Sequence, residues 1–453
     1  MSEGKLVFRL LWENNIKISY LNTSLILLII LATTGRVVAS FHSIDFQNMF
    51  HGAFITHQSR RLSSKARIST RRISMSVSGS SPQLGKGFEQ FSLAPMMDYT
   101  DRHYRFLMRL LSKKMVLYTE MVAGGTVINN LEDELGRWLD YNEEVEHPVI
   151  LQLGGSNIED LTLAAKRCAP YRYDAINLNC GCPSEKVAGK GCFGAALMRD
   201  PELVAAICES MASVSNCPIT VKHRIGVDND DSYEKLCNFI TTVSEKAPVS
   251  HFIVHARTAI LKGLSPAQNR EIPPLKYDYV YQLVKDFPHL QFTINGGITT
   301  YDQCKEHLSN GVHGVMVGRA INSDPYYWSQ VDENIYGTEN PGFSRGEVLE
   351  RYGEYCDRIE GIRGPKVRQT LKKHILNVFA GQKHGKKFRC AMDELVRTDL
   401  PLSKVFQSAA EILADETLDA KPGEKVFIPR INGTSSSQNE ETQQGEAPTI
   451  LAT

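Results

Sequence analysis

Asn177-Leu-Asn-Cys-Gly-Cys-Pro-Ser184 follows an apolar run near the middle of the chain and predicts a strand that ends in a tight turn. Side chains alternate across a strand, so Asn177 and Asn179 are expected to face one side while Cys180 packs on the other. Gly181 and Pro183 end the strand and leave Cys182 in the turn just beyond it. A cysteine at that point is open to whatever the strand end faces. Cys182 is therefore the candidate reactive residue.

Apolar runs of the same kind alternate with amphipathic stretches from Phe91 onward, which predicts βα units and a parallel sheet. Their number fits a TIM (β/α)8 barrel. The alternative is an open doubly wound sheet, but no Gly-x-Gly-x-x-Gly motif follows the first run. The runs are Phe91–Ala94, Val116–Thr119, Val149–Leu153, Ala175–Asn179, Ile219–His223, Phe252–His255, Phe292–Asn295 and Gly314–Val317, and two of the predicted helices are Pro201–Val214 and Tyr233–Glu245.

Active sites of TIM barrels lie at the carboxyl ends of the strands, and nearly every predicted strand here ends in polar or glycine residues. The loops after the last two strands commonly bind phosphate, because glycine lets backbone N–H groups approach its oxygens. Arg319 can add charge-assisted bonds there. The strand ends hold Pro95-Met96-Met97, Thr119-Glu120, Gln152, Asn177, Asn179 and Cys182, Lys222, His255, Asn295-Gly296-Gly297 and Gly318-Arg319.

A lysine that points into a barrel mouth needs an anion or an electron-rich partner, and the N1/O2 edge of a flavin would suit Lys222. The alternative is a surface lysine whose side chain snorkels to the solvent. Gln152 can both donate and accept hydrogen bonds, which matches the alternating edge of a flavin ring. His255 could contact the phosphate or the ring, although a core histidine with internal partners is the alternative. Cys182 can act as a proton donor to a carbon atom, and we prefer it to Cys192 for that role.

The composition is that of an ordinary soluble protein: 453 residues, 42% hydrophobic, 23% charged, with a formal net charge of zero. It allows one large domain and a smaller one, and argues against wholesale coating of nucleic acid. The ten cysteines are scattered, which indicates reduced thiols. A zinc site at Cys180, Cys182 and Cys192 would lack a matching second pair, so no metal is expected.

Residues 1–85 read as a targeting leader. The apolar block Leu25–Ala32 is too short for a membrane span of about 20 residues but suits a signal sequence. The stretch from Gln47 to Lys86 is rich in serine and arginine and has no acidic residue, as transit peptides are. The combination resembles the bipartite leader of proteins sent to complex plastids. A mitochondrial presequence, a signal anchor or a cytosolic protein that starts near Met75 are the alternatives. No stable membrane association is expected of the mature form.

Taken together, these residues resemble the dihydrouridine synthase family, and the insertion Leu264–Leu275 resembles its bacterial A-type subgroup. One difference is Cys180, which stands where bacterial members often have an aliphatic residue. The matching stretches are Ala94–His103, Tyr118–Met121, Gln152–Ser156, Asn177–Ser184, Phe193–Met198, Val221–Gly226, His255–Arg257, Gly263–Pro266, Asn269–Leu275, Ile294–Gly297 and Gly314–Arg319.

The resemblance implies an NADPH-driven reduction of D-loop uridines in tRNA, at positions 20 and 20a. FMN would give hydride to uracil C6, Cys182 would protonate C5, and Asn179 would help to hold the base. The implied FMN-binding residues are Pro95, Met96, Met97, Gln152, Lys222, His255, Asn295, Gly296, Gly297, Gly318 and Arg319.

The barrel is expected to span residues 86–335, followed by a helical tRNA-binding domain over 343–415, which includes Arg345–Arg358 and Val367–Phe379, and by a disordered tail over 420–453. The helical region is dense in basic residues, and no Asp or Glu lies between Gly361 and Met392. A base in folded RNA must be extruded to reach such a site. The residues expected at the RNA are Asn179, Arg257, Asn269, Arg270, Arg368 and Lys372.

Two rival functions stay open on the sequence. One is an FMN-dependent barrel oxidoreductase that acts on a small metabolite. The other is a catalytically silent RNA-binding or chaperone barrel, which would have no need of Cys182 and Lys222 at strand ends. We expect a monomer.

Overall fold

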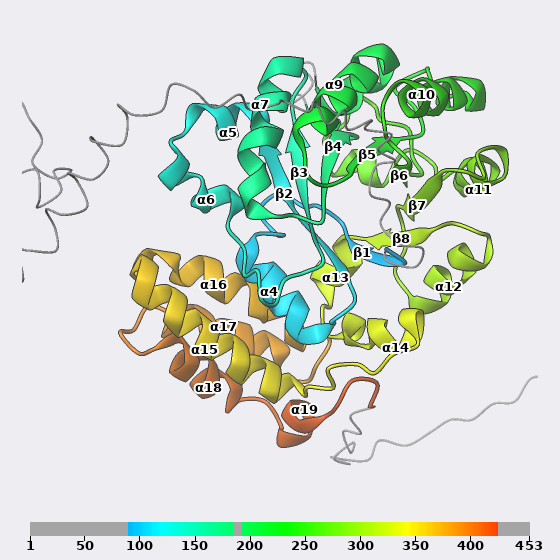
Figure 1. Cartoon of the computed structure of the whole chain (residues 1–453). Coiled ribbons are helices and arrows are strands. Elements are labelled where there is room, and N and C mark those ends of the chain that lie inside the picture. The colour runs from blue at the N-terminus through cyan, green and yellow to red at the C-terminus, as the bar shows by residue number, and fades with distance from the viewer. Residues whose placement is uncertain (1–88, 185–192, 425–453) are drawn as a thin grey trace, which may run out of the picture. The chain divides into compact units, whose positions relative to one another are not determined.

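The computed structural model describes residues 89–184 and 193–424, so the predicted leader, Cys192 and nearly all of the predicted tail lie outside the described residues. Eight parallel strands close into a barrel in chain order, which confirms the predicted TIM barrel (Figure 1). The strands are β1 (Phe91–Leu93), β2 (Val116–Ala123), β3 (Val149–Gly154), β4 (Ala175–Cys180), β5 (Ile219–Arg224), β6 (His251–His255), β7 (Gln291–Asn295) and β8 (Gly314–Val317).

Pairing of β1 with β8 closes the barrel, with Phe91 opposite Val315 and Leu93 opposite Val317. One face of the strands fills the interior with small and branched side chains, among them Ala175 and Ile253. The other face, which includes Leu178 and Cys180, packs against the surrounding helices. Strand alternation thus sets the two layers of the core.

Helices cover the outside of the barrel (Figure 1). In α9, Asp200 caps the N-terminus by accepting from the Leu203 amide, and Pro201 fills the first position, so the predicted bounds hold. These helices are α4 (Arg102–Leu111), α5 (Gly124–Asn129), α6 (Gly136–Leu139), α7 (Ile158–Cys168), α9 (Pro201–Val214), α10 (Tyr233–Lys246), α11 (Tyr277–Asp286), α12 (Tyr301–Ser309), α13 (Arg319–Ser323) and α14 (Val331–Tyr336).

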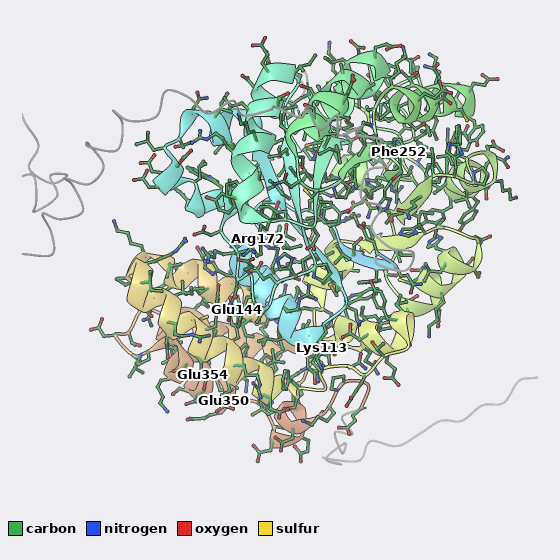
Figure 2. The ribbon with its side chains drawn as sticks, in the orientation of Figure 1. Lys113, Glu144, Arg172, Phe252, Glu350 and Glu354 are labelled. Atoms are coloured by element: carbon green, nitrogen blue, oxygen red, sulfur yellow. The ribbon has the colours of Figure 1, made fainter. Side chains whose placement is uncertain are left out.

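The C-terminal region is all helical, as predicted: α15 (Arg345–Arg363), α16 (Arg368–Ile375), α17 (Gly385–Leu395), α18 (Leu402–Ala410) and α19 (Asp415–Asp419). Helix α15 begins at a capping box of Ser344 and Glu347 and runs past the predicted end at Arg358, because the first break is Gly364 at φ +75°. Glu350 and Glu354 lie on its exposed side (Figure 2). In the described part of the chain, no helix is both long and apolar enough to span a membrane.

A buried polar cluster joins Glu89, just before β1, to Tyr118 of β2 and His251 of β6. Tyr118 donates to Glu89 Oε1 at 2.6 Å, and His251 Nδ1 lies 3.3 Å from Glu89 Oε2. Burial raises the pKa of Glu89 to about 7, against the opposing effect of the Tyr118 bond. Since the folded protein holds this proton more tightly than the unfolded chain, the Glu89 contribution to stability is present at low pH and is lost as the pH rises through about 7.

We expect Glu89→Gln to keep both contacts, because the amide can accept from Tyr118 and donate toward His251. The free energy of unfolding of Glu89→Gln, measured by urea denaturation, should rise relative to the unmodified protein between about pH 5 and about pH 8. Glu89→Ala should cost about 1–3 kcal/mol, because the Tyr118 hydroxyl loses its acceptor. A pH-independent difference between the protein and Glu89→Gln would contradict this assignment.

Candidate active site at the carboxyl ends of the strands

Asn179 holds the turn that carries Cys182. Its Oδ1 accepts from the backbone amides of Gly181 and Cys182, both at 3.0 Å, and its Nδ2 donates to Gln152 Oε1 at 2.8 Å. Cys182 is partly exposed, whereas Cys180 is fully buried on the opposite face of β4, as predicted. The structure therefore gives Asn179 a positioning role for the turn that carries the thiol, and its predicted contact with the target base stays a prediction.

A buried hydrogen-bond chain continues from Asn179 into the barrel. Gln152 Nε2 donates to Asn177 Oδ1 at 2.8 Å, and Asn177 Nδ2 donates to Thr220 Oγ1 at 2.9 Å. The chain fixes the Gln152 amide with its oxygen toward Asn179 and leaves one N–H for another acceptor. The sequence placed Asn177 on this face but indicated no function for it; two polar residues at alternate positions of a buried strand were the signal.

Arg224, at the end of β5, was not predicted as a site residue. It is buried without a carboxylate partner among the described residues and donates to the carbonyls of Gly181 at 3.2 Å and Asn269 at 3.0 Å. Burial lowers its pKa to about 10. Arg224 thereby ties the cysteine turn to the loop after β6 and places a positive charge within electrostatic range of Cys182. Its place two residues after Lys222, on the same face of the strand, could have indicated it.

Lys222 points to the same end of the barrel. Its Nζ donates to Asn295 Oδ1 at 3.0 Å, and Asn295 Nδ2 donates to the Met316 carbonyl at 2.8 Å. Burial, followed by the charge of Arg224, lowers the pKa of Lys222 to about 7. Only one of its three donor directions has a partner among the described residues, so the amine can bind an anion or an electron-rich edge.

The predicted glycine loops lie beside Lys222. Gly296 and Gly297 have φ of +117° and +74°, and a Cβ on Gly296 would lie 2.7 Å from His255 Cδ2, so only glycine fits. A Cβ on Gly318 would lie 3.2 Å from Ala94 and 3.4 Å from Met96 Sδ, which places the Pro95–Met97 segment beside the β8 loop. The segments after β1, β7 and β8 thus meet at one place.

His255 and Arg319 complete this cationic end of the barrel. The His255 ring has no hydrogen-bond partner among the described residues, and burial followed by the charges of Arg224 and Lys222 holds its pKa well below the usual value. Arg319 is half-exposed and is oriented by Glu271 at 2.7 Å and by the Arg270 carbonyl at 3.1 Å. The arrangement favours a bound anion near neutral imidazole and fixed guanidinium groups.

The residues predicted at the RNA divide into two groups. Arg257 lies just after β6 and Arg270 lies in the Leu264–Leu275 insertion, and both side chains are partly exposed. Each has a buried Nε–H without a partner among the described residues. Asn269 is 0% exposed and folds the insertion by pairing with both backbone groups of Ile260. It stabilises the loop and does not face an RNA.

Arg368 and Lys372 also require a correction. Arg368 is buried, makes a bidentate pair with Glu360 at 2.7 and 2.9 Å and donates to the Val396 carbonyl. Lys372 is buried and pairs with Asp393. Both side chains lie on the inner face of α16, where carboxylates of α15 and α17 pair with them. The exposed basic residues between Gly361 and Met392 are Arg363, Lys366, Lys383, Lys386 and Lys387. None of them forms an ion pair within the described part of the chain.

No group of three His, Cys, Asp or Glu side chains that could hold a metal ion occurs within residues 89–184 and 193–424.

Comparison with known proteins gives one family and several close relatives. The family model of dihydrouridine synthase matches residues 92–412. The chain is 44% identical over 305 residues to a tRNA-dihydrouridine(20/20a) synthase of Vibrio vulnificus, covering 67% of this chain and 91% of the relative. It is 47% identical over 304 residues to the Shewanella oneidensis protein of that name, covering 67% and 88%. For the Escherichia coli K12 protein of that name, identity is 44% over 327 residues, covering 72% and 92%.

Proposed function

Since this chain belongs to the dihydrouridine synthase family, we propose that it reduces D-loop uridines of tRNA to dihydrouridine at positions 20 and 20a, with FMN and NADPH. The names of its relatives support the tRNA substrate and the positions. The observation that carries the proposal is the meeting of Cys182, on a turn held by Asn179, with Lys222 at one end of the barrel.

The residues at the strand ends fit an FMN. The backbone around Gly296, Gly297 and Gly318 would hold its phosphate, with His255 and Arg319 beside it. Gln152 and Lys222 would meet the ring edge, where each has donor capacity left. Bound FMN, reduced by NADPH, would supply hydride to uracil C6.

Cys182 then donates its thiol proton to C5, so that the C5=C6 bond receives one hydride and one proton. Asn179 fixes the backbone amides of Gly181 and Cys182, which lead into the thiol, and Arg224 fixes the Gly181 carbonyl. Because both contacts are to the backbone, they orient Sγ without consuming its proton. Pre-organisation of this kind supports a general acid that acts on one face of a flat base.

The test is reconstitution. The purified full chain, unmodified tRNA transcript and NADPH should yield dihydrouridine at positions 20 and 20a. Dihydrouridine mapping in tRNA from each compartment of cells that lack the protein should show loss at the same positions. Unchanged dihydrouridine in every compartment would exclude the proposal and favour a small-metabolite oxidoreductase.

The exposed basic residues of the helical region are proposed to bind tRNA phosphates. We expect Lys386→Ala/Lys387→Ala to raise the Kd for tRNA and to reduce the slope of log Kd against log salt by about 0.7–0.9 for each phosphate that is no longer neutralised. The control is Lys113→Ala/Lys114→Ala, a second exposed pair of lysines. This pair lies just before β2, and therefore at the amino ends of the strands and away from Cys182; Figure 2 labels Lys113. Equal slopes for the two double variants would contradict phosphate binding by Lys386 and Lys387.

We further propose that residues 1–85 address the protein to a plastid, and that the enzyme acts as a monomer. Residues 1–90 fused to a fluorescent protein should direct it to plastids. Accumulation in mitochondria or cytosol would support the alternatives instead.

A further inference from the structure

The segment between β1 and α4 exposes two large apolar side chains at the active end of the barrel. Met97 is 56% exposed and Tyr99 is 40% exposed. Both follow Pro95 and Met96, which lie beside the β8 loop. Exposed aromatic rings at a reactive centre are candidates for binding rather than for packing.

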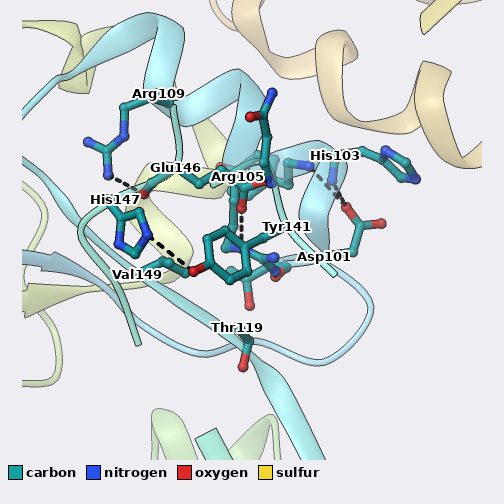
Figure 3. Close-up of polar contacts among 12 residues, drawn as sticks. Asp101, His103, Arg105, Arg109, Thr119, Tyr141, Glu146, His147 and Val149 are labelled. Carbon is teal, nitrogen blue, oxygen red and sulfur yellow. Dashed lines mark hydrogen bonds and ion pairs between the residues drawn. The ribbon is translucent and has the colours of Figure 1, made fainter. Parts of the chain in front are cut away.

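The segment is nevertheless held rigidly. The amides of Tyr99 and Thr100 donate to the Met96 carbonyl at 3.1 and 3.0 Å, and Thr100 Oγ1 accepts from the Met96 amide at 3.0 Å. Where the segment enters α4, Asp101 caps the helix (Figure 3). Arg105 donates to the Thr100 carbonyl at 2.9 Å. The backbone that carries Tyr99 is therefore fixed, which lowers the entropy cost of ordering this segment on binding.

Two other elements, β2 and α16, hold Asp98 at the centre of this segment. Asp98 has φ of +65°, which non-glycine residues adopt at some cost, and its amide donates to Glu120 Oε1 at 2.5 Å. From the helical region, Lys373 of α16 donates to the Asp98 carbonyl. The helical region thus fixes the loop that carries Tyr99.

Tyr99 lies among cations. Lys373 Nζ is 4.6 Å from the centre of its ring, and Arg270, which is within electrostatic range of both Tyr99 and Cys182, has a buried Nε–H with no partner among the described residues. The Tyr99 hydroxyl likewise has no hydrogen-bond partner in the described part of the chain. Lys373 lies over one face of the ring, and the side chain is 40% exposed. An exposed ring surface flanked by a lysine and an arginine matches an unstacked nucleotide, with its base on the part of the ring that Lys373 leaves uncovered and its phosphates on the cations.

We propose that Tyr99 stacks on the base of a nucleotide that flanks the target uridine, while Lys373 and Arg270 bind its phosphates. The inference rests on the proposed function, because it takes tRNA as the ligand. By holding the neighbour of the extruded base, Tyr99 would set which uridine reaches Cys182.

The test measures affinity without turnover. Full-length protein without NADPH is titrated with unmodified tRNA transcript, and with two transcripts that each lack the base at one nucleotide flanking the target uridine. Base–aromatic stacking corresponds to about 5- to 150-fold in affinity, so Tyr99→Ala should weaken binding of the intact transcript about tenfold. For the transcript that lacks the base on which Tyr99 stacks, Tyr99→Ala should not weaken binding further. Tyr99→Phe and Tyr99→Trp should retain the intact affinity.

The matched control is Tyr327→Ala, which removes a tyrosine that is 39% exposed and adjoins Trp328, itself packed on Phe91 at the start of β1. Unchanged affinity in Tyr99→Ala, equal loss on intact and abasic transcripts, or a Tyr99→Phe as weak as Tyr99→Ala would each overturn the proposal. Failure of the proposed function would instead appear as absence of dihydrouridine from the unmodified protein's reaction.

Discussion

Cys182→Ala is expected to lower the rate of dihydrouridine formation by about 10²–10⁴-fold, the usual contribution of a positioned general acid. The substitution removes the thiol from the Asn179-held turn and leaves the backbone hydrogen bonds of that turn in place. Reduction of bound FMN by NADPH should be unchanged, because Cys182 lies on the turn after β4 and not on the glycine loops. Single-turnover assays that follow flavin oxidation by tRNA would measure the loss directly.

Two cysteine variants serve as controls. Cys192→Ala tests the alternative thiol, which lies outside the described residues, and Cys390→Ala removes an exposed cysteine of α17. Both should keep full activity. An active Cys182→Ala protein together with an inactive Cys192→Ala protein would reverse the assignment of the acid.

Lys222→Met is expected to slow NADPH-dependent flavin reduction by about 10²-fold, comparable to the loss of one pre-organised charge that stabilises a developing anion. Reduction puts negative charge on the flavin edge that Lys222 is proposed to meet, so the variant should lower the reduction potential as well as the rate. Lys276→Met is the control, since Lys276 already pairs with Asp231 at 2.8 Å. Equal rates for Lys222→Met and the unmodified protein would contradict the assignment.

The same lysine predicts a pH effect on the protein without FMN. Because burial lowers its pKa to about 7, the folded protein loses this proton well before the unfolded chain does. Its contribution to stability is therefore present at high pH and is lost as the pH falls through about 7. Between about pH 7 and about pH 10, the free energy of unfolding of the FMN-free protein, measured in urea, should rise with pH relative to that of Lys222→Met. Bound FMN should reduce that difference, since an anionic partner raises the pKa of the amine.

The barrel and the order of its site loops could be predicted from local patterns alone. Short apolar runs predict the strands, and in a TIM barrel the active site lies at the carboxyl ends of those strands. The positions of Cys182, Lys222 and the glycine pairs followed from that rule, and the structure brings them together at one end. Helix ends were predicted less well where the stop signal was a single glycine, as at Gly364.

Only the tertiary structure decided how each polar group is used. The sequence predicted Asn269, Arg368 and Lys372 as RNA contacts. In the structure, Arg368 and Lys372 form ion pairs with Glu360 and Asp393 of neighbouring helices, and Asn269 is hydrogen-bonded across its own loop. Conversely, the sequence placed Asn177 at a strand end without a function and did not indicate Arg224. The structure shows that Arg224 bonds to the cysteine turn and Asn177 to Gln152.

For the turn at Asn177–Ser184, the sequence by itself determined a strand, its two faces and a cysteine just past its end, because these depend on residues next to one another. The tertiary structure decided that Asn179 holds the turn that carries the thiol, that Arg224 fixes the adjoining carbonyl and that Tyr99 stands exposed at the same end of the barrel. The contacts that set this arrangement join residues far apart in the chain, and their free energy depends on burial and distance, which no local pattern specifies.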